Sequence, residues 1–169
     1  MDDVKIKSFD PFDYQNFFHE YKIKSTKDEI NQIIFLLKSN KDYEEQKTTF
    51  NNLNVLNFPI LKNLRSQVIK ILELHNLLLG DNWAQLYNKL NKHSIHTHPY
   101  SDYSGIIYLN PDKPSPTIFY DNFFKKYYYQ GAKDIMLLFP SHIPHEVESL
   151  NKNEERLIIS FNSTKKNKK

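Results

Sequence analysis

Four short apolar segments in the second half of the chain decide the fold: SGIIYL (104–109), PTIFYD (116–121), DIMLLF (134–139) and RLIISFN (156–162). Each has the length of a β-strand, is rich in Ile, Phe, Tyr or Leu, and is bounded by Pro, Asp, Asn or Lys. A fifth segment of strand length, NWAQLYNK (82–89), alternates apolar and polar residues. Because no helical pattern separates these five strands, the sequence predicts an antiparallel sandwich or barrel rather than a parallel βαβ sheet.

The first half of the chain has helical periodicity instead. The segment STKDEINQIIFLLK (25–38) opens with capping residues, either Ser25 with Asp28 or Thr26 with Glu29. Such pairs satisfy the free N–H groups of a first helical turn. Apolar residues at helical spacing follow, so the sequence predicts a helix here.

A second helix is expected between Pro59 at its start and Gly80 just past its end. We expect a short edge strand around Val4 and Ile6, and a loop with at most one short helix over residues 40–57. The predicted fold is mostly β with N-terminal helices. The apolar stripe of the second helix consists of Leu61, Leu64, Val68, Ile71, Leu72 and His75.

Composition limits the classes of function. The chain has 169 residues and no Cys, which excludes thiolate metal sites and a Cys nucleophile. Its net charge is +3, but four Lys lie in the last five residues, so the rest of the chain stands at −1. We therefore expect no nucleic-acid partner. One domain over residues 1–163 and a disordered basic tail over 164–169 are predicted.

The expected location is the cytoplasm, because the N-terminus does not read as a secretory signal and no apolar run reaches the ~18 residues of a membrane span. A composition heavy in Lys, Asn and Ile indicates an AT-rich genome, such as that of a phage or a bacterium, and a phage protein would act in the host cytoplasm. The oligomeric state cannot be read from the sequence.

Five of the seven histidines fall in two short segments, HSIHTHP (93–99) and SHIPHEV (141–147). On a strand, residues i and i+2 point the same way, so His96 and His98 can converge on one point. A histidine from a neighbouring strand would complete a three-imidazole face suited to Fe(II), Zn or Cu. Polar loop residues at strand ends are the alternative interpretation.

Arginine use is selective: the chain has 21 Lys and only Arg65 and Arg156. Arg65 belongs to the second predicted helix, whereas Arg156 opens a strand of buried composition. An arginine there indicates a bidentate carboxylate clamp. A salt bridge with Glu154 or Glu155 is the alternative.

Three pieces, in order, resemble the Fe(II)/2-oxoglutarate-dependent oxygenase family: HTHPYSDYSGIIYLN (96–110), FPSHIPHEV (139–147) and EERLIISFN (154–162). They are most similar to its prolyl-hydroxylase-like branch, and to a small bacterial and phage subgroup with H-x-H-P followed by S-G-x-x-Y. The likeness covers roughly residues 83–162. It implies a double-stranded β-helix, or jelly-roll, core over 81–163, with a mainly helical support over 1–80.

The resemblance also implies roles for single residues. His96 and His145 would be iron ligands, and Arg156 would hold the far carboxylate of 2-oxoglutarate. Tyr108 and Tyr87 would add contacts to this cosubstrate.

The chain departs from the family at two positions. Most members carry a carboxylate two residues after the first His, where this chain has His98; Asp102 is the alternative ligand if its loop folds back onto the metal. Two residues after the arginine the family often has Ser or Thr, and here Ile158 stands, so Ser160 on the same strand face is the candidate polar contact.

The resemblance implies a dioxygenase that couples decarboxylation of 2-oxoglutarate to hydroxylation of an unactivated C–H bond. A prolyl residue, or another small-molecule, amino-acid or peptide substrate, is expected. Two alternatives stay open: a cupin-like three-His dioxygenase or lyase without a keto-acid cosubstrate, and a non-catalytic metal-binding barrel. An aromatic run between Phe119 and Tyr129 either lines the substrate entrance or packs the barrel.

Overall fold

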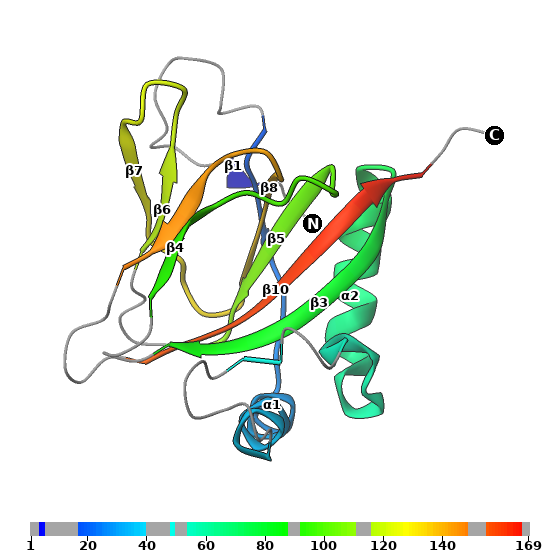
Figure 1. The fold of residues 1–169 in the computed structure, drawn as a ribbon. Helices are drawn as coiled ribbons and strands as arrows, with labels where there is room; N and C mark the ends of the chain where they lie inside the picture. Colours follow the sequence, from blue (N-terminus) through cyan, green and yellow to red (C-terminus); the bar gives the residue numbers. More distant parts are fainter. Residues whose placement is uncertain are drawn as a thin grey trace.

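The computed structural model describes residues 4–5, 17–39, 48–49, 54–87, 92–110, 116–148 and 155–166. Two antiparallel sheets face each other as a jelly roll, so the predicted fold class is confirmed (Figure 1). The larger sheet has the order β1 (Val4–Lys5), β2 (His19–Lys22), β8 (Ile135–Pro140), β5 (Tyr103–Tyr108), β10 (Arg156–Lys165) and β3 (Leu77–Tyr87). The smaller sheet has the order β4 (His93–His96), β9 (His145–Val147), β6 (Thr117–Tyr120) and β7 (Lys126–Tyr129).

The central strands of the larger sheet are buried on both faces. On β10, Leu157 and Ile159 belong to the core beneath the helices, whereas Ile158 belongs to the core between the two sheets. On β5, Ile107 and Ile106 divide between the two cores in the same way. This double burial explains why these strands read as nearly continuous apolar runs, since side chains alternate between the faces of a sheet.

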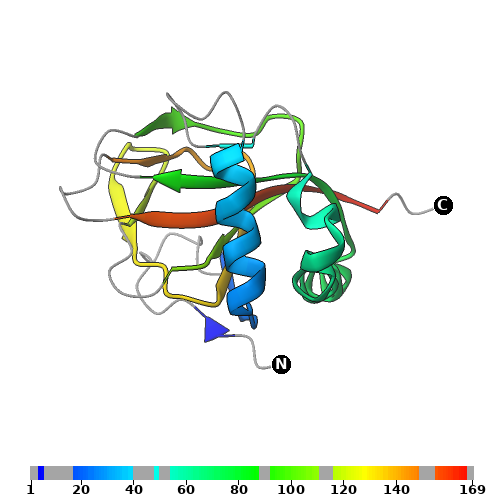
Figure 2. The same ribbon diagram turned by 90° about the horizontal axis from the view of Figure 1, so that it is seen from below.

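Two helices cover the outer face of the larger sheet, on the side away from the smaller sheet (Figures 1 and 2). The first, α1 (Lys27–Ser39), opens with the capping box predicted for Thr26 and Glu29. The Glu29 N–H donates to Thr26 Oγ1 at 3.2 Å, and the Thr26 N–H donates to Glu29 Oε2 at 2.7 Å. Glu29 also accepts from the Leu64 N–H, so one buried carboxylate ties the two helices together.

The second helix is shorter than its sequence pattern predicts. Residues 55–57 and 59–61 form 3₁₀ turns, η3 (Val55–Asn57) and η4 (Pro59–Leu61), before α2 (Lys62–Leu74) begins. The predicted end at Gly80 is wrong, because Asn76 adopts a φ of 57° and β3 starts at Leu77. Asn tolerates this left-handed conformation, so it ends the helix without a glycine.

The helical half of the chain also supplies strands. The strand expected near Val4 is confirmed as β1, but β2 was not predicted, and β3 begins four residues before the expected start of the jelly roll. At the other end, β10 extends to Lys165, two residues into the predicted tail; residues 167–169 of that tail lie outside the described residues. The domain boundaries themselves stay a prediction. Within the described part of the chain, no helix has the length and apolar character to cross a membrane.

Gly105 on β5 tests how tightly the sheet packs. A Cβ placed there would lie 2.0 Å from the nearest ring carbon of Phe161, which is fully buried on β10. We expect Gly105→Ala to lower the free energy of unfolding by about 1–3 kcal/mol, because the added methyl group overlaps the ring and one of the two must shift. Chemical denaturation measures this.

The compensating variant Phe161→Leu provides the control. A smaller side chain removes part of the clash, so the Gly105→Ala/Phe161→Leu double variant should lose less stability than the two single variants together. Strict additivity would contradict the proposed contact.

Candidate metal centre

Three imidazoles meet between the sheets where β4 and β9 pair. His96 ends β4, His145 begins β9, and the two residues stand directly opposite in the register. His98 follows two residues later, with its backbone N–H donating to the Ser141 carbonyl at 2.9 Å. One ring nitrogen from each of the three histidines lies within 4.8 Å of the others. The structure therefore brings together the three residues that were expected to converge.

Backbone carbonyls set the orientation of two of these rings. His96 Nδ1 lies 2.8 Å from the Ser94 carbonyl oxygen, and His145 Nδ1 lies 3.0 Å from that of Ile143. A carbonyl oxygen only accepts, so in the neutral ring Nδ1 carries the proton and Nε2 carries the lone pair. Nε2 is thus the atom that each ring offers to a metal ion.

Burial keeps the imidazoles neutral. Desolvation, reinforced by His96 and His93, lowers the pKa of His98 to about 4. Burial also lowers the pKa of His96, and it holds the pKa of His145 well below the ordinary range. Neutral imidazole is the form that binds a metal, so the donor set fits a borderline divalent ion such as Fe(II), Zn or Cu.

A fully buried guanidinium occupies the other end of this region. Arg156 opens β10 and donates from Nη2 to Thr117 Oγ1 at 2.8 Å and from Nη1 to the Pro116 carbonyl at 3.4 Å. Its Cζ lies 5.4 Å and 5.3 Å from the ring centroids of Tyr87 and Tyr108, within the range of cation–π attraction.

Arg156 has no carboxylate partner among the described residues, and its buried Nε has no hydrogen-bond partner there. The sequence offered Glu154 and Glu155 as salt-bridge partners of Arg156. Glu155 is exposed on the surface, and Glu154 lies outside the described residues. A buried, unpaired guanidinium is costly. The arrangement is therefore that of a site prepared for an anionic ligand.

The imidazoles and the guanidinium line one pocket of about 370 Å³, a volume that includes its opening to solvent. Tyr87 and Ser160, both predicted cosubstrate contacts, line the same pocket. Tyr108 lies behind its wall instead, with its hydroxyl 2.6 Å from Thr117 Oγ1. Arg156, Thr117 and Tyr108 thus form one chain of polar contacts at this end.

The structure does not bring Asp102 to the imidazoles. Its side chain is exposed, and Oδ2 accepts the backbone N–H of Lys165 at 2.7 Å. The aromatic run is also absent from the described pocket wall. Phe119 and Tyr129 are buried in the core between the sheets, whereas Phe123, Phe124 and Tyr128 are exposed.

Several residues of the described pocket wall were not singled out from the sequence, His93 and Thr117 among them. His93 stacks on His96 with ring centroids 3.9 Å apart, and its Nδ1 lies 3.3 Å from the Tyr87 hydroxyl. Residues three apart on a regular strand face opposite ways, but the β4–β9 register shifts between His93 and His96. Thr117 carries no sequence signal beyond its place at the start of a strand.

Known structures share this fold. A viral collagen prolyl hydroxylase from Paramecium bursaria Chlorella virus-1, solved with 2OG, is 10% identical at a TM-score of 0.64, covering 89% of this chain and 97% of that one. A Trichoplax adhaerens prolyl hydroxylase, in complex with a hypoxia-inducible-factor peptide fragment, is 17% identical at a TM-score of 0.64. The match covers 88% of this chain and 84% of that one. SnoN, a non-heme alpha-ketoglutarate-dependent epimerase from nogalamycin biosynthesis, is 10% identical at a TM-score of 0.65. The match covers 90% of this chain and 80% of that one.

No protein-family model and no curated protein sequence matches the chain. The expected resemblance to 2-oxoglutarate-dependent oxygenases is confirmed at the level of the fold. A shared fold does not determine the reaction; the residues of the pocket do.

The lowered pKa values predict an acid-sensitive fold in the metal-free protein. Burial is the main cause for both His98 and His93, whose pKa values fall to about 4, whereas an unfolded chain titrates near 6.5. Between these values the unfolded chain binds protons that the folded chain does not, so stability falls as pH falls from 6.5 to 4. Thermal unfolding with a chelator present, followed by circular dichroism, measures this slope.

The variant His98→Gln isolates the effect, because glutamine stays neutral over the whole range. Its melting temperature should depend less steeply on pH than that of the wild type. An imidazole of His98 that titrates near pH 6.5 in the folded protein would contradict the prediction.

Proposed function

We propose that this protein is an Fe(II)- and 2-oxoglutarate-dependent dioxygenase that hydroxylates an unactivated C–H bond of a prolyl, other amino-acid or peptide substrate. One observation carries the proposal. A single pocket joins a face of three neutral imidazoles to a buried guanidinium that has no carboxylate partner among the described residues. A metal ion alone would need only the imidazoles. A metal ion with a dicarboxylate cosubstrate would use the imidazoles for the metal and the guanidinium for the far carboxylate.

His96, His98 and His145 would hold the iron through one ring nitrogen each. With 2-oxoglutarate and dioxygen bound, the iron supplies the oxidising chemistry, which converts the keto acid to succinate and carbon dioxide and inserts oxygen into the substrate. Three ligands from one face leave the remaining coordination positions open. The backbone carbonyls that hold His96 and His145 preset this face before metal binds.

Arg156 would bind the far carboxylate of 2-oxoglutarate through its planar fork, since charge-assisted bidentate bonds are the strongest that a side chain makes. Thr117 and Tyr108 hold the guanidinium in place from behind. Burial is the main cause that raises the pKa of Tyr87 to about 12, so its hydroxyl stays neutral, donates to Gln85 Oε1 and lines the wall beside Arg156. Ser160 lines the same wall and would add a further polar contact.

The substrate class is supported by the neighbours and by the pocket. The Trichoplax adhaerens enzyme was solved with a peptide, and the viral enzyme is named for collagen. Apolar side chains of the pocket wall, Ile106, Phe139 and Val147 among them, are compatible with the apolar ring of a prolyl residue. Because one of the neighbours is an epimerase, epimerisation at the reacting carbon is the second candidate reaction.

The test is an anaerobic titration with Fe(II) and then 2-oxoglutarate, monitored through the weak visible charge-transfer band of the chelate. We expect the band in the wild type and its loss in both His145→Ala and Arg156→Ala. Loss of the guanidinium should weaken 2-oxoglutarate binding by at least about tenfold, because a buried charge-assisted pair contributes roughly 1.5–3 kcal/mol.

Arg65→Ala is the matched control, since Arg65 is the only other arginine of the chain and is exposed on α2. It should bind 2-oxoglutarate like the wild type. Metal binding without a band, unaffected by Arg156→Ala, would instead favour a cupin-like enzyme without a keto-acid cosubstrate. Tight metal binding with neither a band nor oxygen uptake would favour a non-catalytic barrel.

A further inference from the structure

We infer that the pocket selects a substrate that presents a carboxylate, as a free amino acid or the C-terminus of a short peptide does, next to the metal. This inference rests on the proposed function and deepens it. None of the seventeen described residues that line the pocket is Asp or Glu. A site that would hold a divalent ion and an arginine therefore contains no described anionic side chain to neutralise them.

The charges follow from the ligand set. Three neutral imidazoles leave a divalent ion with its full charge of two, and the guanidinium of Arg156 adds one. The dianion 2-oxoglutarate neutralises two of these three charges. A carboxylate ligand in place of His98 would remove the third positive charge. The imidazole instead leaves that charge at a face of two half-buried histidines and one buried histidine, where water screens it only in part.

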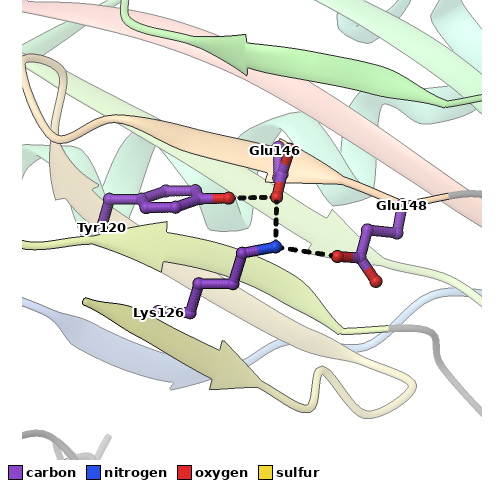
Figure 3. A network of polar contacts seen from close by, with 4 residues as sticks. All are labelled: Tyr120, Lys126, Glu146 and Glu148. Carbon is purple, nitrogen blue, oxygen red and sulfur yellow. Dashed lines mark hydrogen bonds and ion pairs between the residues drawn. The ribbon is translucent and has the colours of Figure 1, made fainter. Parts of the chain in front are cut away.

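Carboxylates close to the site in sequence are engaged elsewhere. On β9, His145 and Val147 point into the pocket, so Glu146 and Glu148 point to the opposite face. There Lys126 Nζ lies 3.1 Å from Glu146 and 3.0 Å from Glu148 (Figure 3).

Further carboxylates are held by other contacts of the described residues. The Tyr120 hydroxyl also donates to Glu146 (Figure 3). Glu20 accepts from the Tyr129 hydroxyl, and Asp102 accepts from the Lys165 N–H. None of these three carboxylates lines the pocket, so no carboxylate of the described residues neutralises the third positive charge, which is left for a ligand.

The pocket wall offers a donor for such a ligand. Gln85 lines the pocket and accepts the Tyr87 hydroxyl through Oε1 at 3.0 Å. Its amide Nε2 has no hydrogen-bond partner among the described residues, so it can donate to a carboxylate.

The experiment uses protein loaded with Co(II), which has a visible spectrum and does not turn over, and saturated with 2-oxoglutarate. Sodium azide is the monoanionic probe, and the cobalt absorption bands report its binding. We expect the wild type to bind azide at least about tenfold more tightly than His98→Asp, which restores one negative charge at a ligand position. Equal affinities in the two proteins would overturn the inference.

A second measurement needs only the wild type, and it tests the inference even if His98→Asp does not bind cobalt. N-acetyl-L-proline and N-acetyl-L-alanine are each compared with their uncharged amides as competitors of azide. The acids should displace azide at concentrations at least about tenfold lower than the amides. Displacement by neither, or by both alike, would overturn the inference.

Failure of the proposed function is read separately. If 2-oxoglutarate produces no change in the cobalt spectrum, the keto-acid function fails. The azide comparison then tests only whether the metal-loaded pocket prefers an anion. Tighter azide binding by the wild type than by His98→Asp still supports the inference, and equal binding still overturns it.

Discussion

The pairing of β10 with β3 on one side and β5 on the other is the constraint on which the site depends. These two ladders hold Arg156 opposite Tyr87 and Ile158 opposite Tyr108. A shift of one residue would move the guanidinium from the core between the sheets to the core beneath the helices, because side chains alternate strictly along a strand. That shift is unfavourable because it would take the guanidinium away from Thr117 Oγ1 and the Pro116 carbonyl and bury it in an apolar core without hydrogen-bond partners.

The second constraint acts across the smaller sheet. The β4–β9 pairing sets His96 opposite His145, and the irregularity before His96 turns His93 toward the same pocket. His98 lies beyond the end of β4, where the hydrogen bond from its N–H to Ser141 holds the chain in place. The position of the three imidazoles thus depends on one strand pair and one backbone hydrogen bond, while that of the guanidinium depends on the larger sheet. The two halves of the site meet only because the sheets pack face to face.

Much of this could be predicted from the sequence, and the reasons are local. The sequence pattern predicts the strands β3, β5, β6, β8 and β10, one of two capping pairs at the first helix, and the convergence of His96 and His98. The structure selects Thr26 and Glu29 as the capping pair. The end of the second helix could not, because Gly80 is the stronger sequence signal and Asn76 carries the left-handed turn instead. The four residues of β2 were missed because a short strand has little periodicity of its own, and its pairing with β8 defines it.

By itself, the sequence determined which residue types were available: clustered histidines, an arginine in a lysine-rich chain, and strands apolar enough to be buried on both faces. Only the tertiary structure decided which of them share a pocket. It turned Asp102 toward the Lys165 N–H, placed Thr117 beside Arg156, and turned Glu146 outward to Lys126. The physical reason is that periodicity specifies the face of a strand on which a side chain lies, whereas the charge around a site depends on which strands become neighbours, and that is set by long-range packing.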